Sequence, residues 1–422
     1  MHPRSRSASA AAAAPAAAAA PAATTVRAVA GAATGRLPAT AAILAAFLAA
    51  GAFTARPAAA VTWRVEADGS GDFTGLQAAA DAAASGDTLR VGAGRFATLQ
   101  SRATVDGTFE TALCVPVPDL TVIGAGRDLT FIGPPTWYGP VGEYPKGVTA
   151  TGAGVVRLRG LTVENLPHAV WWPGGTVDLR DCRLRAGGFG FIGLHADGTG
   201  GAAVDCTFET TEEDGFAVWL EGAPSFAVTG CRFDGPGSGV TVAGASTGVA
   251  VAGCEVAGAF GGILFDGSAG SVTDCLVTAA AVVGFAAIGG AQVSLDHLFV
   301  RGADTGLHVG SGADVTGDAV VLEQTQNTAV ALDGDAVLAL HGSHLLPSAG
   351  RAVSCWGYPG ATVTQDLTGN WWGVTDAAAV AAMIHDLADD ADVHCLVDYE
   401  PLAGAPLGAA AVSWGDLKAS FR

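Results

Sequence analysis

Five side chains could together form a carbohydrate-binding surface if the fold brings them to one face. Trp171, His195, Trp219, Glu221 and Asp266 are the candidates. Flat indole rings cover the apolar faces of sugars, and carboxylates or imidazoles bind the hydroxyl groups at their edges. Scattered surface tryptophans are the alternative interpretation, since isolated exposed aromatic residues are common.

Two further aromatic candidates for substrate binding, Trp137 and Tyr138, lie in a loop rich in proline and aromatic residues between Gly133 and Gly154. Loops of this length in a compact domain are often functional. We expect this loop to wall the end of the surface nearest Trp171. A packed surface loop without a binding role is the alternative.

Charged residues supply a candidate metal site and a candidate anion site. Glu212, Glu213 and Asp214 could bind Ca²⁺ through their carboxylates, although such a run is more often a solvated loop. Five arginines between Arg157 and Arg185 form the basic patch of the chain. Glu164, Arg185 and Glu209 are expected to pair across neighbouring strands.

A short pattern that recurs ten times between Leu158 and Trp372 predicts how these residues are positioned. It reads aliphatic, any residue, Gly or Asp, a ladder residue, any residue, apolar. The spacing of 20 to 27 residues is typical of a solenoid, in which each coil buries its core against its neighbours. The ladder residues are Leu161, Cys182, Cys206, Cys231, Cys254, Cys275, Leu298, Asp318, Ser343 and Asn370.

The residues around each ladder position form regular columns. The third residue before it and the second after it are apolar in every repeat, with Val315 and Val320 filling these columns around Asp318. The residue just before it is Gly, Asp or His, which tolerate positive φ, so we expect one tight bend per coil.

A second strand in each repeat places the candidate binding residues. Its outward column holds Trp171 and Trp219, about 10 Å apart if they lie two coils apart. The next column is expected to hold His195, Glu221 and Asp266. The five residues then form one strip over five successive coils.

The repeat resembles the right-handed parallel β-helix of the pectin lyase-like proteins of exported bacterial type, over roughly residues 61 to 400. The resemblance implies an all-β, single-stranded solenoid of about 12 coils with short capping helices at both ends. That fold hosts lyases, hydrolases, esterases and inert adhesins. If the protein is an enzyme, the resemblance implies a polysaccharide lyase or glycoside hydrolase, but the specific motifs of polygalacturonases and pectin methylesterases are missing.

The chain divides into three expected parts. Residues 1–60 are an Ala-rich leader with the layout of a secretory signal cleaved near Ala60, which predicts a secreted or cell-surface protein. Residues 61–402 form the β-helix with an amino-terminal cap (61–87) and a carboxyl-terminal cap (370–402). Residues 403–422 are a linker and short tail.

Each cap is expected to contain one helix. Thr74 and Gln77 predict a capping box for a helix over 75–84. Asp376 is the expected N-cap of a helix over 377–387.

The cysteine spacing predicts free thiols rather than disulfides. Stacked ladder side chains lie about 4.8 Å apart and parallel, whereas a disulfide needs Cβ atoms near ~3.8 Å with converging directions. The five ladder cysteines should therefore be buried thiols. Cys355 and Cys395, outside the ladder, are the one pair considered for a bond.

The net charge of −19 argues against nucleic acid or anionic membranes as partners. The mature chain has no expected transmembrane segment and is expected to be a monomer. No cofactor is required, and Ca²⁺ is optional. Two functions remain open: an exported β-helix that binds or processes a polysaccharide or cell-surface glycan on an exposed face, or a non-catalytic surface or adhesive structural protein.

Overall fold

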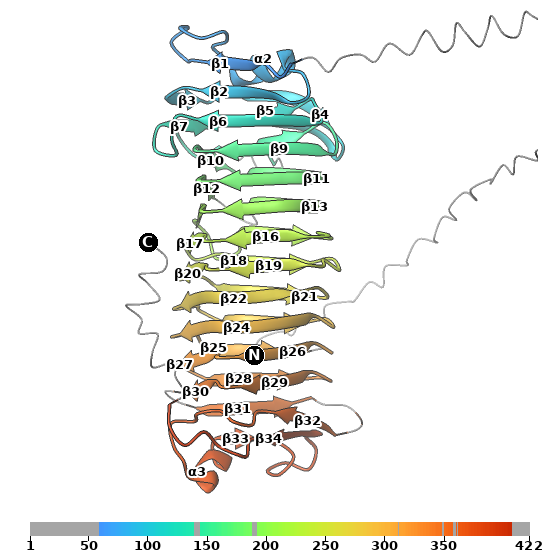
Figure 1. Cartoon of the computed structure of the whole chain (residues 1–422), viewed down its shortest axis with the longest axis vertical. Coiled ribbons are helices and arrows are strands. Elements are labelled where there is room, and N and C mark those ends of the chain that lie inside the picture. Colours follow the sequence, from blue (N-terminus) through green and yellow to red (C-terminus); the bar gives the residue numbers. More distant parts are fainter. Residues whose placement is uncertain are drawn as a thin grey trace, which may run out of the picture. The chain divides into compact units, whose positions relative to one another are not determined.

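A computed structural model of the protein describes residues 59–138, 144–187, 192–310, 312–347, 350–357, 360 and 362–406. These residues wind into a parallel solenoid, as predicted, with about 13 coils where about 12 were expected (Figure 1). The described residues from Ala59 onward form one compact unit. The predicted signal segment up to residue 58 and the tail from residue 407 lie outside the described residues.

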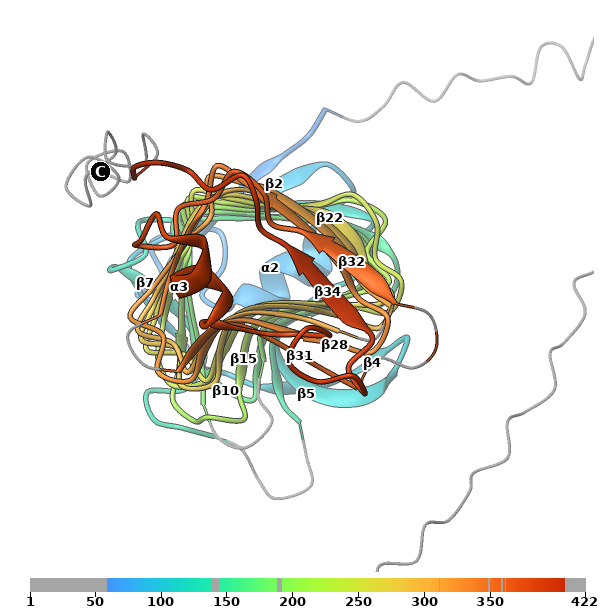
Figure 2. The ribbon, with the colours of Figure 1, turned by 90° about the horizontal axis from the view of Figure 1, so that it is seen from below.

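Three parallel sheets enclose one core, which Figure 2 shows in cross-section. Sheet I consists of β5 (Gly107–Val115), β8 (Lys146–Ala150), the start of β11 (His168–Arg180) and of β13 (Ile192–Val204), β15 (Phe216–Glu221), β18 (Ser238–Ala243), β21 (Gly261–Asp266), β23 (Val283–Ile288), β25 (Thr305–Val309), β28 (Thr328–Asp333), β31 (Arg351–Trp356) and β33 (Ile384–His385). The candidate binding residues of the repeats all belong to this sheet.

The other two sheets complete each coil. Sheet II consists of β1 (Thr62–Val65), β2 (Asp87–Val91), β6 (Asp119–Gly124), β9 (Gly154–Arg159), the ends of β11 and β13, β16 (Phe226–Thr229), β19 (Val249–Ala252), the start of β22 (Ala269–Thr278) and of β24 (Gln292–Arg301), β26 (Asp314–Asp318), β29 (Val337–His341), β32 (Val363–Asp366) and β34 (Cys395–Asp398). Sheet III consists of β3 (Gly94–Phe96), β7 (Thr130–Ile132), β10 (Thr162–Leu166), β12 (Arg183–Ala186), β14 (Thr207–Thr210), β17 (Arg232–Asp234), β20 (Glu255–Ala257), the ends of β22 and β24, β27 (Val321–Glu323) and β30 (His344–Leu346). The short β4 (Gln100–Thr104) pairs antiparallel with β5.

The predicted tight bend joins sheet II to sheet III in each coil. The residues before the ladder position have positive φ; in nine coils they are of the predicted types, namely Gly160, Asp181, Asp205, Gly230, Gly253, Asp274, His297, Gly342 and Gly369. In the eighth coil the residue is Ala319 instead of the predicted Gly317. The next side chain then points inward. At the carboxyl-terminal end this residue is the buried Asn370, whose amide nitrogen donates to Leu340 O at 2.7 Å and Leu367 O at 2.8 Å.

The predicted register is wrong in the eighth coil. Asp318 pairs with Asp296, and Leu322 pairs with Val300, so the ladder residue is the fully buried Val320. A shift of two residues keeps every inward side chain inward, because strands have a period of two, and the apolar columns therefore did not reveal it. The corrected spacings, 298 to 320 and 320 to 343, are 22 and 23 residues.

The cysteine predictions are confirmed. Cys182, Cys206, Cys231, Cys254 and Cys275 are buried free thiols stacked through five coils, and Cys114 is also free and buried. Cys355 and Cys395 form a disulfide between sheets I and II. Contacts with the Cys231 and Cys275 thiols, together with burial, raise the pKa of Cys254 well above its usual range.

The ladder thiols are expected to react with a thiol reagent such as DTNB in guanidinium but not in the native protein, because burial excludes the reagent and disfavours the thiolate. Six thiols should titrate in denaturant, and all eight after reduction. Fast labelling of a ladder cysteine in the native protein would contradict the buried ladder.

The two caps differ from the predicted helices. The amino-terminal helix is α2 (Leu76–Ala82), whose N-cap is Gly75 without a side-chain cap, so the predicted capping box is wrong. The Gln77 amide instead bonds the Cys114 backbone at 2.7 and 2.9 Å, which ties the helix to β5. Because a buried main-chain partner was within reach, Gln77 does not cap the helix.

The carboxyl-terminal helix is α3 (Ala377–Ala381), and Asp376 caps it as predicted by accepting from Ala379 N at 2.8 Å. The helix ends earlier than expected, because Ile384–His385 pairs with β31 as strand β33. Part of the predicted loop before Gly154 is likewise strand β8, which fills a place in sheet I. Within the described residues, no helix is both long and apolar enough to cross a membrane.

Candidate functional site

Trp171, His195 and Trp219 occupy one column of sheet I on three successive coils. Trp171 pairs with His195, and His195 pairs with Trp219. The prediction that His195 falls in the column of Glu221 is wrong, since Asp197 pairs with Glu221 there. The correction places the imidazole between the two indoles rather than beside them.

The rings of this column touch one another and the neighbouring aromatic side chains. The Trp171 and His195 ring centroids are 4.5 Å apart, and those of His195 and Trp219 are 6.2 Å apart. His168 meets Trp171 edge-on at 4.7 Å, and Phe216 meets Trp219 edge-on at 4.5 Å. We call His168, Trp171, His195 and Trp219 the aromatic strip.

Lys146 closes the amino-terminal end of the aromatic strip. Its ammonium lies 3.2 Å from the centroid of the Trp171 ring and 3.8 Å from that of Phe109. The side chain is fully buried, and the nitrogen makes no hydrogen bond. Burial lowers the pKa of Lys146 to about 8. The two rings give partial compensation, since a desolvated cation is attracted by aromatic faces.

Burial also keeps the two histidines neutral. It lowers the pKa of His168 to about 3, assisted by the charges of Lys146 and His195. The pKa of His195 is lowered by burial and partly restored by Glu221, whose Oε2 lies 3.6 Å from His195 Nε2. Neutral imidazoles can both donate and accept hydrogen bonds at neutral pH.

Buried polar atoms without a hydrogen-bond partner concentrate on this face. Eight side chains of sheet I, on six successive strands from β5 to β18, have such atoms; they are Thr111, Lys146, Thr149, His168, Trp171, His195, Trp219 and Thr241. Buried polar groups in native proteins are nearly always paired, so each exception needs an explanation. The exceptions cluster on the face that also carries the half-buried rings of Trp171 and Trp219, which makes this face the candidate site.

The acidic candidates flank the strip along the edge where sheet I turns into sheet II. Glu221 and Asp266 are exposed and lie in the column next to the strip, with Ala243 between them. The structure therefore brings Trp171, His195, Trp219, Glu221 and Asp266 to one face over five coils. Their part in binding stays a prediction.

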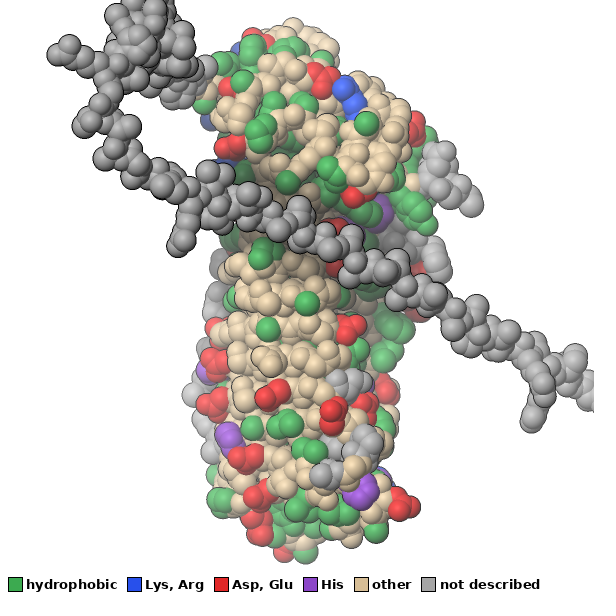
Figure 3. All heavy atoms as spheres, turned by 90° about the vertical axis from the view of Figure 1, so that its right-hand side faces the viewer, with side chains coloured by type: hydrophobic (Ala, Val, Ile, Leu, Met, Phe, Trp, Pro, Cys, Tyr) green, Lys and Arg blue, Asp and Glu red, His purple; other side chains and the backbone are tan. Residues whose placement is uncertain are grey.

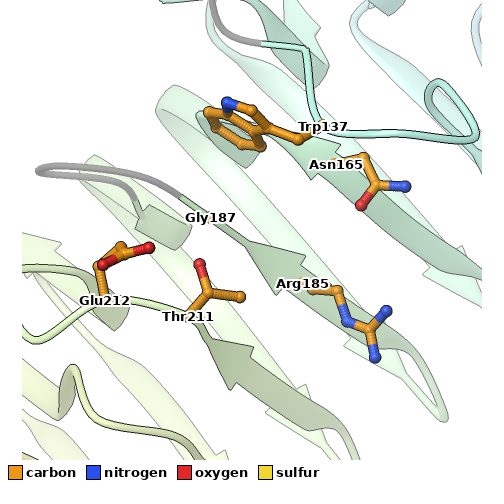
Figure 4. Close-up of a pocket in the computed structure, with 6 residues that line it drawn as sticks. All are labelled: Trp137, Asn165, Arg185, Gly187, Thr211 and Glu212. Carbon is orange, nitrogen blue, oxygen red and sulfur yellow. The ribbon is translucent and has the colours of Figure 1, made fainter.

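A pocket of about 260 Å³ lies between the loop that carries Trp137 and the ends of β12 and β14 (Figure 4). It is lined by Trp137, Asn165, Arg185, Gly187, Thr211 and Glu212. Asn165, at positive φ, positions the loop: its carbonyl accepts from Tyr138 N at 3.0 Å, and its amide donates to Pro134 O at 2.9 Å.

The predicted charge ladder beside this pocket is confirmed. Arg185 donates to the Glu209 carboxylate at 2.6 Å and lies 3.7 Å from the Glu164 carboxylate. Glu164 also accepts from Arg95 at 2.6 Å. The guanidinium is thereby held in place at the pocket rim. Tyr138 donates its hydroxyl to Glu110 at 2.7 Å and so joins the aromatic loop to β5.

The predicted calcium site is exposed. Glu212 and Glu213 face solvent, and Asp214 is half-buried. Among the described residues, no group of three or more His, Cys, Asp and Glu side chains is arranged to hold a metal ion. Calcium binding there stays a prediction.

The basic patch lies on sheets II and III, away from the aromatic strip. Arg157 contacts Asp119 and Asp178, and Arg183 contacts Asp128 and Glu209. On the face in Figure 3, acidic side chains are scattered along the length of the solenoid, whereas basic ones appear near the amino-terminal end. The patch is thus largely neutralised by its neighbours.

Sequence reasoning missed the buried half of the site. His168 and Phe216 precede the outward column by three residues, and Lys146 lies in the stretch expected to be a loop. One signal was available for Lys146: the chain contains just two lysines, and this one is followed by a β-branched, apolar segment.

Residues 147–324 match the family model of the right handed beta helix region. With the parallel solenoid, this confirms the predicted right-handed parallel β-helix at the level of the fold. A search of curated protein sequences found no match.

Several solved structures are similar. A pectin methylesterase from carrot is 17% identical with a TM-score of 0.43, over 57% of this chain and 83% of its own. The A-module of a mannuronan C-5 epimerase from Azotobacter vinelandii is 12% identical with a TM-score of 0.44, over 76% and 90%. An alginate lyase from Paenibacillus sp. is 11% identical with a TM-score of 0.39, over 71% and 98%. At these identities the similarity concerns the fold alone.

Proposed function

We propose that this right-handed parallel β-helix binds an extended polysaccharide along sheet I, over the aromatic strip. The observation that carries the proposal is the column of touching rings on sheet I, with half-buried Trp171 and Trp219 and with the exposed carboxylates of Glu221 and Asp266 in the next column. Sugars present both apolar faces and hydroxyl edges, so they match such a surface.

The geometry favours a chain that runs along the solenoid axis. Trp171 and Trp219 lie two strand spacings apart, which is about 10 Å. Glu221 and Asp266 follow the same direction on the exposed edge, where they can accept hydrogen bonds from hydroxyl groups. A polymer with repeated rings and hydroxyls would meet equivalent groups on each coil.

The net charge of −19 bears on the kind of glycan. A neutral glycan meets no repulsion, whereas a polyuronate would need bridging Ca²⁺ or a basic group. Lys146 is the basic group nearest the strip among the described residues, but its ammonium is enclosed by Trp171 and Phe109. We therefore favour a neutral polysaccharide.

Processing of the bound chain would need a proton donor or acceptor beside it. His195 and Glu221 are 3.6 Å apart at the middle of the strip and could exchange a proton with a sugar hydroxyl or glycosidic oxygen. Release of new reducing ends, or of unsaturated ends absorbing in the ultraviolet, would show hydrolase or lyase activity respectively.

The proposal is tested by titrating neutral and acidic oligosaccharides, with and without Ca²⁺, while recording calorimetric heats and tryptophan emission. Trp171→Ala combined with Trp219→Ala should weaken binding at least about fivefold, because each aromatic contact contributes roughly 0.5–1.5 kcal/mol. Leu396→Ala, at an exposed position of β34 in sheet II, is the control and should bind as the wild type does.

Two results would overturn the proposal. One is the absence of binding by the wild type across the panel. The other is unchanged affinity in the double variant, provided that its circular dichroism still shows the β-rich fold.

A non-catalytic structural role in a cell-surface layer is the second candidate. The burial of His168 and His195, at 4 and 8% exposed, favours it, because buried rings stabilise coil stacking whether or not a ligand binds. The same double variant separates the two candidates. If the strip is purely structural, the variant should have a lower unfolding temperature, and neither it nor the wild type should bind a glycan.

A further inference from the structure

A second cluster of ring and acid groups lies on sheet I near its carboxyl-terminal end. His308 on β25 is held by Asp333 on β28, with Nε2 and Oδ2 2.8 Å apart. The Trp356 ring from β31 stacks on the imidazole with centroids 6.3 Å apart and planes 28° apart. Trp356 is 43% exposed, although large apolar side chains in this protein are mostly buried.

His308 lies in the same column as the aromatic strip. The register runs from Trp219 to Thr241, Leu264, Ala286 and then His308 without interruption. Four strand spacings separate Trp219 from His308, which is about 19 Å. The cluster is therefore in line with the strip along the solenoid axis.

The interval between the two clusters carries no bulky ring in this column. Thr241 and Ala286 are short and buried, and Leu264 is half-buried. The exposed Asp266 stands at the edge of this interval, in the column that also contains Glu221 and Asp333. A chain that leaves Trp219 can thus continue over flat sheet beside one further carboxylate before it reaches His308.

We propose that His308, Asp333 and Trp356 form a second sugar-binding platform, and that the ligand is a polymer long enough to contact both platforms at once. The inference rests on the proposed glycan binding by the aromatic strip. Asp333 orients the imidazole, and Trp356 supplies the exposed ring face for an apolar sugar face. A chain bound at both places gains affinity from the high effective concentration of its second contact.

The test compares trisaccharides, too short to reach both platforms, with decasaccharides, which can. The probes are β-1,4-linked xylose oligomers and α-1,4-linked galacturonic acid oligomers, measured by calorimetry with the full chain. The wild type should bind the decasaccharide of one series at least about tenfold more tightly than its trisaccharide. Trp356→Ala should remove most of that difference and leave trisaccharide binding at the aromatic strip unchanged.

Trp356→Phe should restore most of the length dependence, because it keeps an aromatic face. Val337→Ala, at a position 41% exposed on β29 in sheet II, is the matched control and should behave as the wild type. His308→Ala is a second variant at the platform and should reproduce Trp356→Ala. Unfolding temperatures confirm that each variant is folded.

The outcomes separate the inference from the proposed function. If Trp171→Ala with Trp219→Ala weakens binding but Trp356→Ala leaves the length dependence intact, the second platform is wrong and the proposed function stands. Equal affinity of the wild type for both lengths also overturns the second platform. If neither oligomer series binds the wild type, the inference falls together with the proposed function for these two glycan classes.

Discussion

Replacing Lys146 with methionine is expected to raise the free energy of unfolding at pH 7 by about 1–3 kcal/mol. The lysine has a pKa of about 8 in the folded protein, against 10.5 when free, and this difference corresponds to roughly 3 kcal/mol at pH values below both. The contacts with Trp171 and Phe109 offset part of that cost. Methionine fills a similar volume without a charge.

The effect should depend on pH in a defined direction. Because the folded pKa is the lower one, the unfolded chain binds more protons between pH 8 and 10.5, and the stability of the wild type rises with pH in that window. The advantage of Lys146→Met should therefore be largest below pH 8 and shrink toward pH 10.5. Guanidinium unfolding of the wild type and the variant at pH 7 and pH 10 measures this difference in the free energy of unfolding.

Arg159→Met serves as the control, because this arginine is exposed on β9 of sheet II and its removal should change stability little. A loss of stability in Lys146→Met at pH 7 would contradict the interpretation of Lys146 as a buried charge that its ring contacts compensate only in part. If the variant is more stable and binds glycan less tightly, Lys146 lowers the stability of the fold but raises the affinity for glycan, as residues at functional sites often do.

Removing the Cys355–Cys395 disulfide is expected to lower the free energy of unfolding of the carboxyl-terminal cap by about 4 kcal/mol. The bond closes a sequence separation of 40 residues and connects β31 in sheet I to β34 in sheet II. Loop-closure entropy for a ring of this size gives that magnitude. Both side chains are fully buried, so their replacement also removes packing at the last coils.

The loss should be local, because each coil of a solenoid contacts only its neighbours. Hydrogen exchange in Cys355→Ala with Cys395→Ala should accelerate across β31–β34 and remain slow at β11–β15. Cys231→Ala is the comparison within the ladder, where faster exchange should centre on β17. Uniform acceleration along the whole chain would show that the solenoid unfolds as a single unit and contradict the local effect.

The sequence could reveal most of the solenoid because its signal repeats. Nine of the ten bends are made by a Gly, Asp or His that tolerates positive φ and is followed by an inward side chain, so the sequence shows the same geometry many times over. The error at Asp318 shows the limit of this signal. Apolar alternation has a period of two, so it fixes which side chains face inward but not a displacement of two residues along the strand.

The site was less predictable because it depends on register between loops of different length. The connection before β13 is longer than the connection before β11. The sequence therefore does not fix which column His195 occupies, and the prediction placed it one column too far. Lys146 could not be placed because its strand precedes the first regular repeat. Its burial beneath Phe109 arises from the β4–β5 hairpin, which no repeat column describes.

Because the register of sheet I is uninterrupted, distances along the solenoid axis between residues of one column are whole multiples of the strand spacing. Each coil adds one strand to the sheet, so adding or deleting one whole coil between Trp219 and His308 would move the two clusters by one strand spacing, about 4.8 Å, while keeping them in one column. The length of chain that spans both would change in equal steps. If both clusters bind one glycan chain, as proposed, natural gain or loss of a coil would change the preferred polymer length without altering any of the side chains in the two clusters.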